Sequence, residues 1–464
     1  MNTINGVKTI HKTAFLSLIA KLQKIMHVAE IDSAVFFSLL SKLWSIVAGP
    51  ITVILIAYKF TPELQGYYFT FINLIALQVF IELGLGVVII QFASHEWSKL
   101  SLNKAGYIVG ESEALSRLIS LAKITIKWYL IGSLIAIFGL GIVGYIFFSQ
   151  SQTSNLNWML PWLIMCLITG GAIFLIPIWS LLEGCNQVST LYAFRLWQGI
   201  FSNICAWISI SFGAGLWALI VANAVTLICG VIFLGKKYPN FIKSLLFSQS
   251  SISVIKWRND ILPMQWRIAV SYISGYFANF IFTPVLFHYH GAVTAGQFGM
   301  TWNIIFNIGV ISMAWLNPKI PRFGMLIAQQ KYKELDDLFW RLTKIIITVV
   351  ILLSVSFWLT VYLLNRFEYT LSNRLLSPLP TMILLLAIIV LYTCVPFATY
   401  IHAHKKEPLV VTSVLSGLLT ALFTLILGKY YSSTGAAIGF LANNLIIVPI
   451  VIIICYRCRI AWHK

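Results

Sequence analysis

The chain has 464 residues, of which 59% are hydrophobic and only 10% are charged, and its mean hydropathy is +0.87. Soluble globular domains carry about 25% charged residues, so this composition excludes a soluble enzyme and predicts an all-α polytopic membrane protein. The formal net charge of +18 would suggest a nucleic-acid partner in a soluble protein. In a membrane protein, however, Lys and Arg must first be explained by topology.

The N-terminal segment, residues 1–33, does not resemble a signal peptide, because its apolar run is short and lies between Lys12 and Lys21. Apolar residues recur at i, i+3 and i+4 between Phe15 and Met26. This spacing predicts an amphipathic helix on the cytoplasmic surface of the membrane.

Apolar segments long enough to cross the hydrocarbon core, about 30 Å thick, predict twelve transmembrane helices. They fall near 34–58, 66–93, 124–149, 158–182, 192–212, 215–235, 266–287, 295–317, 343–364, 376–401, 409–428 and 435–456. We therefore expect an N-lobe at 34–235, a cytoplasmic linker at 236–265, a C-lobe at 266–456 and a cytoplasmic tail at 457–464.

The basic residues are distributed unequally between the two sides of this arrangement. With the N-terminus inside, 27 of the 32 Lys and Arg residues lie in or next to cytoplasmic segments, and four lie in external loops. Such asymmetry is typical of the positive-inside rule, so it predicts that both termini are cytoplasmic. It also explains most of the charge without nucleic acid.

The two halves of the chain resemble each other. Residues 215–223 and 435–443 share Gly, Ala and Asn in register, and Pro177 and Pro396 occupy equivalent helices. Further equivalent pairs are Gly66 with Gly296 and Asn73 with Asn303. Each half has an even number of spans, so the pattern predicts two six-helix lobes related by a pseudo-twofold axis along the membrane normal, which is a transporter plan.

Two stretches carry a resemblance to a known family. The second span begins PELQGYYFTF and ends IELGLGVVIIQF, and the seventh begins Met264-Gln-Trp-Arg-Ile268. Both resemble Wzx-type polysaccharide flippases of the multidrug/oligosaccharidyl-lipid/polysaccharide exporter (MOP) superfamily. The resemblance implies a flippase of the bacterial cytoplasmic (inner) membrane that carries an undecaprenyl-pyrophosphate-linked oligosaccharide for O-antigen, capsule or exopolysaccharide synthesis. A polymerase and a chain-length regulator of that pathway are then candidate partners.

Two ionisable side chains lie inside predicted spans. Lys42 is about 12 Å and Glu82 about 17 Å from the cytoplasmic end of adjacent helices. An ionised group inside the bilayer costs at least ~2.5 kcal/mol, so Glu82 indicates a cavity or a partner. The two side chains could pair and line a cavity between the lobes. Alternatively, Lys42 extends to the membrane surface and Glu82 only neutralises it.

Other polar residues are candidates for the same cavity. Arg267 could bind a phosphate in a bidentate manner, or it could be one more cytoplasmic anchor beside Trp266. Arg195 could contact substrate or only pair with Glu183. Amides that could bind sugar hydroxyls, or only join helices, are Asn73, Gln78, Asn279 and Asn303.

The chain has no GxxxxGK[ST], HExxH or GxSxG pattern, so we expect a non-enzymatic protein without nucleotide, metal or other cofactor. Two alternatives remain open. One is a membrane enzyme of the same pathway, a polymerase or acyltransferase. The other is a cation-coupled drug exporter of related fold.

Overall fold

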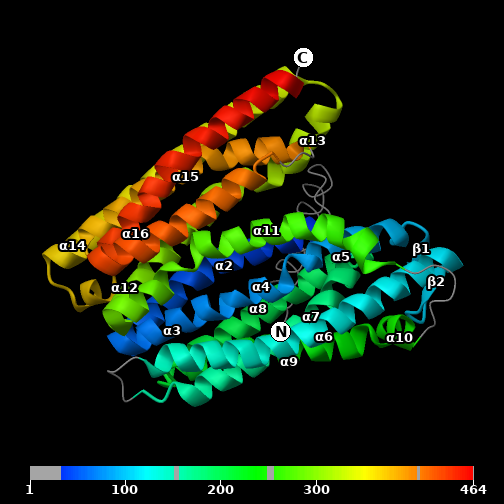
Figure 1. Ribbon diagram of the computed structural model, residues 1–464, viewed down its shortest axis with the longest axis horizontal. Helices are drawn as coiled ribbons and strands as arrows, with labels where there is room; N and C mark the ends of the chain where they lie inside the picture. Colours follow the sequence, from blue (N-terminus) through cyan, green and yellow to red (C-terminus); the bar gives the residue numbers. More distant parts are fainter. Residues whose placement is uncertain (1–32, 151–155, 248–254, 405–407, 463–464) are drawn as a thin grey trace, which may run out of the picture.

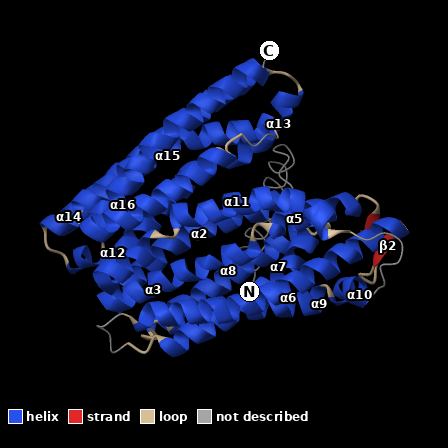
Figure 2. Ribbon diagram, viewed as in Figure 1, coloured by secondary structure: helices blue, strands red, loops and turns tan. Residues whose placement is uncertain are grey.

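A computed structural model describes residues 33–150, 156–247, 255–404 and 408–462. Helices make up nearly all of these residues, and the strands form one short hairpin (Figure 2). The all-α class predicted from the sequence is therefore confirmed. The predicted surface helix between Phe15 and Met26 lies outside the described residues.

The first half of the chain forms the N-lobe. Its membrane segments are α2 (Ser33–Lys59), α3 (Pro62–Ile75), α4 (Val79–Glu82), α5 (Leu85–Trp97), α6 (Ser112–Ser149), α7 (Met159–Gly184), α8 (Val188–Ser211) and α9 (Trp217–Lys237). Between α5 and α6 lies an antiparallel hairpin of β1 (Leu100–Leu102) and β2 (Ile108–Gly110), and α10 (Pro239–Phe247) follows α9.

The second half forms the C-lobe. Its long helices are α11 (Leu262–Asn279), α12 (Phe282–Ser312), α14 (Tyr332–Arg366), α15 (Pro378–Ala403) and α16 (Val410–Trp462). Shorter elements are η2 (Trp257–Ile261), η3 (Met313–Trp315), η4 (Asn317–Lys319), α13 (Ile320–Ala328) and η5 (Thr370–Arg374).

The long helices account for the twelve predicted spans, although some helices contain parts of two. Helix α16 holds the last two spans, with non-helical backbone at Tyr431 and Ser432. Helix α12 holds the end of the seventh span and the eighth, and its backbone breaks at Gly291. By length and hydropathy, nine helices of the described residues could cross a membrane, so the chain is a multi-pass membrane protein.

The second span is not the single helix that the sequence predicted. It is interrupted by a 3-10 turn at Ala76–Gln78 (η1), and then by Leu83 and Gly84, whose φ angles are 49° and 66°. A Cβ atom on Gly84 would lie 2.3 Å from the side chain of Ile268 in α11. Glycine is therefore required here both for its backbone conformation and for the close approach of α11.

The two lobes meet at one end of the molecule and separate toward the other. Figure 1 shows α14, α15 and α16 as one bundle, the helices from α2 to α9 as a second bundle, and α11 between them. Helix α3 of the N-lobe packs against α12 of the C-lobe. The inter-lobe surfaces at the two ends of the molecule therefore differ.

The hairpin is fastened to the lobe by charged side chains. Lys99 Nζ lies 3.0 Å from Glu111 Oε2 across its base, and this hydrogen bond raises the pKa of Lys99 above its usual value. Nearby, Arg117 Nε lies 2.8 Å from the buried carboxylate of Glu96. These pairs hold α5, the hairpin and α6 together at the end where the lobes separate.

Candidate functional site

The lobes are sealed at one end by contact between two equivalent helices. Gly66 of α3 and Gly296 of α12, paired by the internal repeat, face each other, and a Cβ on Gly296 would lie 2.7 Å from the Gly66 nitrogen. A Cβ on Gly66 would lie 1.9 Å from the backbone oxygen of Ala292. Contact between equivalent residues is expected at a twofold axis, so this pair marks the pseudo-symmetry axis between the lobes.

Hydrogen bonds reinforce this seal. The buried amide of Gln65 donates to the backbone carbonyls of Gly296 and Arg374, at 2.9 Å each. The Arg374 guanidinium in turn donates to the backbone carbonyl of Phe60, and its burial lowers its pKa. Of the four basic residues predicted to be external, Lys59, Arg366 and Arg374 end α2, α14 and η5, and Lys429 lies two residues before the break in α16. The sealed end is therefore the predicted external end.

At the other end, a cavity of about 960 Å³ lies between the lobes. Its walls come from α5 in the N-lobe and from α11, α15 and α16 in the C-lobe. Polar and charged side chains that line it are Gln91, Arg267, Ser271, Tyr272, His402 and Ser413. Of the predicted site residues, Arg267 thus faces the inter-lobe cavity, and its guanidinium lies 5.6 Å from the ring centre of Trp266.

Glu82 is held at the break in the second span. It is the last residue of α4, and its carboxylate interacts electrostatically with Tyr129 in α6 and Tyr272 in α11. A Cβ on Gly86 would lie 3.5 Å from Glu82 Oε1. Among the described residues, no ion pair involves Glu82. Because Tyr272 also lines the inter-lobe cavity, Glu82 lies behind its wall.

Lys42 does not pair with Glu82 in the described structure. Helix α2, which carries Lys42, packs against α8 and α12, whereas α4 packs against α6 and α11. The two side chains are therefore on different helix surfaces, and Lys42 is exposed. Adjacency in the sequence suggested a pairing that helix packing does not produce.

A second cavity between the lobes, of about 250 Å³, collects several amides. It lies among α2, α3, α8 and α12, and Asn203, Asn303 and Asn307 line it together with Thr52. The Asn307 amide donates to the Asn303 backbone carbonyl at 2.7 Å. A Cβ on Gly49 of α2 would lie 3.9 Å from Asn307. Asn303 thus faces this cavity, and Asn203 is a site residue that sequence reasoning missed.

The remaining predicted amides have structural contacts. The Asn73 amide donates to the Phe69 carbonyl at 2.8 Å, and the Asn73 backbone carbonyl accepts from Tyr276 of the C-lobe at 3.4 Å. The Asn279 amide donates to the Gly275 carbonyl at 2.9 Å. Both side-chain amides therefore bond within their own helices, and the contact between the lobes is made by the backbone carbonyl of Asn73.

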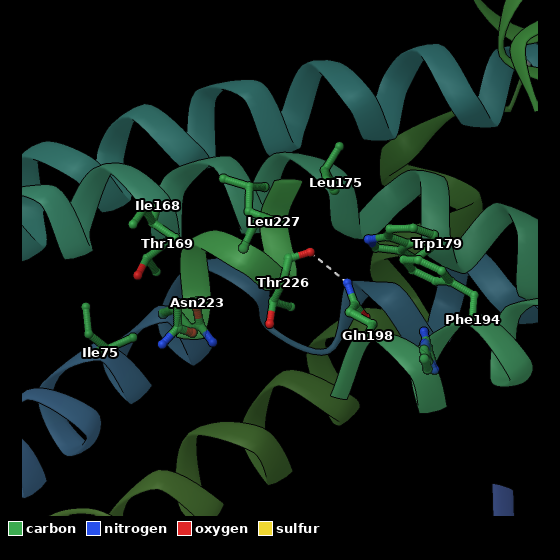
Figure 3. Close-up of a pocket in the computed structure, with 13 residues that line it drawn as sticks. Ile75, Ile168, Thr169, Leu175, Trp179, Phe194, Gln198, Asn223, Thr226 and Leu227 are labelled. Atoms are coloured by element: carbon green, nitrogen blue, oxygen red, sulfur yellow. Dashed lines mark hydrogen bonds between the residues drawn. The ribbon is translucent and has the colours of Figure 1, made fainter. Parts of the chain in front are cut away.

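A third pocket, of about 220 Å³, lies inside the N-lobe (Figure 3). Gln78 from η1 and Arg195 from α8, both predicted site residues, line it. Figure 3 shows Trp179 and Phe194 stacked at one side and the Gln198 amide donating to the Thr226 carbonyl, at 2.7 Å. Arg195 Nη2 lies 3.5 Å from Glu183 Oε2, and that carboxylate accepts from Tyr192 at 3.0 Å.

The predicted site residues are therefore divided among separate cavities. Arg267 lines the large inter-lobe cavity, Asn303 lines the smaller one, and Gln78 and Arg195 line the N-lobe pocket. Gln65 and Tyr272 were missed. The sequence signals for them were indirect, because Gln65 precedes the repeated Gly66 and Tyr272 occupies the position in the second lobe that is equivalent to Lys42.

Comparison with solved structures identifies the fold. A multidrug resistance MATE family transporter of the MOP superfamily in an inward-facing conformation matches with a TM-score of 0.67, 12% identity, and coverage of 90% of this chain and 95% of that one. The lipid II flippase MurJ, in an inward closed conformation, matches with a TM-score of 0.65, 15% identity, and coverage of 90% and 87%. A MOP superfamily transporter from Pyrococcus furiosus matches with a TM-score of 0.58, 14% identity, and coverage of 95% of this chain and 98% of that one.

No family model and no curated protein matches the chain. The structural matches extend over nearly the whole chain, so the chain has the two-lobed, twelve-helix fold of MOP superfamily transporters. The fold class predicted from the sequence is confirmed, and the matched structures are transporters rather than enzymes.

Proposed function

We propose that this protein is a flippase that moves a lipid-linked oligosaccharide, carried on undecaprenyl pyrophosphate, across the bacterial cytoplasmic membrane for O-antigen, capsule or exopolysaccharide synthesis. The observation that carries the proposal is the arrangement of the lobes. They are sealed at the predicted external end and enclose a cavity of about 960 Å³ at the predicted cytoplasmic end, with Arg267 in its wall. Such a cavity suits an anionic head group that enters from the cytoplasmic leaflet.

The chemistry of the cavity supports an amphiphilic, anionic substrate. A guanidinium can form paired, charge-assisted hydrogen bonds with a phosphate, and in this proposal Arg267, which lines the cavity, forms them with the pyrophosphate. The lipid tail remains in the bilayer while the polar head lies between the lobes. Opening of the sealed end and closure of the cavity would then expose the head group on the opposite side, as in alternating access.

The smaller pockets would serve the sugars of the same head group. Asn303 and its neighbours supply amide and hydroxyl groups between the lobes, and the N-lobe pocket supplies Gln78 and Arg195 beside aromatic rings. In this proposal Glu82 controls the packing of the broken second span against α11, and Lys42 attracts the anionic substrate from an exposed position on α2.

Reconstitution tests the proposal directly. The purified protein is placed in liposomes with a fluorescent polyprenyl-pyrophosphate oligosaccharide, and a membrane-impermeant quencher then measures how much lipid changes leaflet. We expect faster translocation than in protein-free liposomes, and much slower translocation for Arg267→Ala when the density of the substrate is low. Equal rates with and without protein would reject the flippase function.

A cation-coupled drug exporter is the second candidate, because a multidrug transporter is among the matched structures. The lining of the inter-lobe cavity argues against a cationic drug. Apart from His402, the charged side chain in this lining is Arg267, which would repel a cation. Cells that lack the protein should keep unchanged drug resistance and should accumulate lipid-linked oligosaccharide. Increased drug sensitivity with normal surface polysaccharide would support the exporter instead.

A further inference from the structure

A separate cavity of about 520 Å³ lies in the outer part of the C-lobe. Its walls are the start of α14 and the end of α16, and its floor is the end of α15. Helix α15 packs against both of its neighbours, so α14 and α16 stand on either side of it and leave a groove. Figure 1 shows the second half of α16 along the edge of the C-lobe that faces away from the N-lobe. The groove is therefore distinct from the inter-lobe cavity.

The groove is lined mainly by aromatic and aliphatic side chains. Phe397 forms part of its floor, and Phe339 and Trp340 come from one wall. Tyr456 and Ile453 come from the other wall and are 60% and 53% exposed, so they face the surroundings of the lobe. In a membrane protein such a surface is covered by lipid, and Trp and Tyr are typical of the boundary between hydrocarbon and head groups.

The side chains that line the groove carry one more positive charge than negative charge. Asp336 is the carboxylate that lines it, and this carboxylate is 2.5 Å from Arg459 Nη2 and accepts from the Tyr400 hydroxyl at 2.9 Å. Arg457 lines the same groove two positions before Arg459 and is exposed. With Asp336 neutralised by Arg459, Arg457 remains to attract an anion.

We propose that this groove binds one anionic phospholipid of the surrounding bilayer, with an acyl chain against the aromatic floor and the phosphate at Arg457. The position at the ends of three helices places a lipid phosphate beside this guanidinium while its chain follows the groove into the hydrocarbon. Basic side chains between helices on the cytoplasmic side form head-group sites in this way. This lipid would tie α14 to α16 across α15.

Native mass spectrometry of the full-length protein in detergent tests the proposal, with phosphatidylglycerol as the anionic probe and phosphatidylcholine as the neutral one. We expect the protein to retain one more phosphatidylglycerol than phosphatidylcholine. Arg457→Gln should weaken phosphatidylglycerol retention at least tenfold. Lys236→Gln, which removes an exposed charge at the end of α9 in the other lobe, is the matched control and should retain the lipid as the unaltered protein does.

A second variant, Ile453→Trp, fills the groove without changing its charge, and it should also release the lipid. If Arg457→Gln fails to fold, Ile453→Trp still tests the proposal. Equal retention of both lipids by the unaltered protein, or unchanged retention in both variants, would overturn the proposal. Dimers that disappear with Ile453→Trp would assign the groove to a second copy of the chain and would also overturn it.

Discussion

At the scale of single residues, Arg267 is the arginine that lines the inter-lobe cavity. A hydrogen bond to a charged group contributes about 1.5–3 kcal/mol. We therefore expect Arg267→Ala to raise the apparent KM for the lipid-linked substrate by about tenfold to a hundredfold, with a smaller effect on the maximal rate. Liposome translocation at varied substrate density measures both values.

The neighbouring Arg258 gives a control for this substitution. It is exposed in η2 and does not line the cavity, so Arg258→Ala should leave KM close to its original value. If both variants behaved alike, the basic residues near the start of α11 would act as topological anchors, and Arg267 would have no role in the cavity.

Glu82 offers a different residue-scale prediction. A carboxylate within a membrane span without an ion-pair partner lowers stability, because ionisation there costs at least ~2.5 kcal/mol. Glu82→Gln keeps the shape of the side chain and removes the charge, so the variant should unfold at a higher temperature and transport more slowly. Thermal unfolding in detergent and translocation in liposomes measure the two effects.

The carboxylate of Glu183 provides the comparison, because it has an ion pair with Arg195 and a hydrogen bond from Tyr192. Substitution of the carboxylate removes the ion pair and weakens the hydrogen bond from Tyr192. Glu183→Gln should therefore lower the unfolding temperature, opposite to Glu82→Gln. Full transport activity in Glu82→Gln would show that the charge of this half-buried acid is not needed for transport.

At the scale of elements, the sequence allowed the spans to be predicted well, since hydropathy and length depend on local composition. It did not allow prediction of the break at Leu83 and Gly84, because hydropathy continues across it. At the break, Gly84 packs closely against Ile268 of α11, a contact between segments far apart in the chain. The same limit applies to the Lys42 and Glu82 pairing, since the neighbours of α2 are α8 and α12.

The candidate site, like the spans, could be predicted only in part from the sequence. Arg267, Asn303, Gln78 and Arg195 were recognisable as polar residues in or near apolar spans, and each lines a cavity. Their distribution among three cavities was not predictable, because it depends on which helix faces become adjacent. The residue types thus predicted that these side chains would line a cavity. The packing of the helices determined which cavity each of them lines.

The contact between α3 and α12 leads to an element-scale prediction. A methyl group on Gly66 would overlap the backbone of Ala292, so Gly66→Ala must separate the two helices. Overpacking of this kind costs about 1–3 kcal/mol. We expect the variant to favour a conformation in which the sealed end is open and to transport at a reduced rate, as measured by translocation in liposomes.

Gly199→Ala is the appropriate control, because a Cβ at that position in α8 meets no atom within 4 Å. That variant should transport normally and be at least as stable, since Ala favours helix more than Gly does. Normal transport by Gly66→Ala as well would mean that the glycine contact is not needed for the conformational cycle.

At the scale of the whole molecule, the sealed end and the open cavity predict unequal access from the two sides of the membrane. In a variant without native cysteines, single cysteines are placed at Gln91 and Ser413, which line the cavity from opposite lobes, and at Gln65 in the seal. A bulky, impermeant thiol reagent should react with the first two from the cytoplasmic side. It should not react with the third from either side, because Gln65 is 1% exposed.

Cysteines at Lys236 and Lys429, in opposite predicted compartments, calibrate the sidedness of this labelling. The charge distribution predicts that the cysteine at position 236 reacts only from the cytoplasmic side and the cysteine at position 429 only from the external side. Addition of the proposed lipid-linked substrate should then protect Gln91→Cys and Ser413→Cys, because its head group would occupy the space between the lobes. Labelling of the cavity cysteines from the external side alone would reverse the assigned orientation, and with it the direction in which the head group enters.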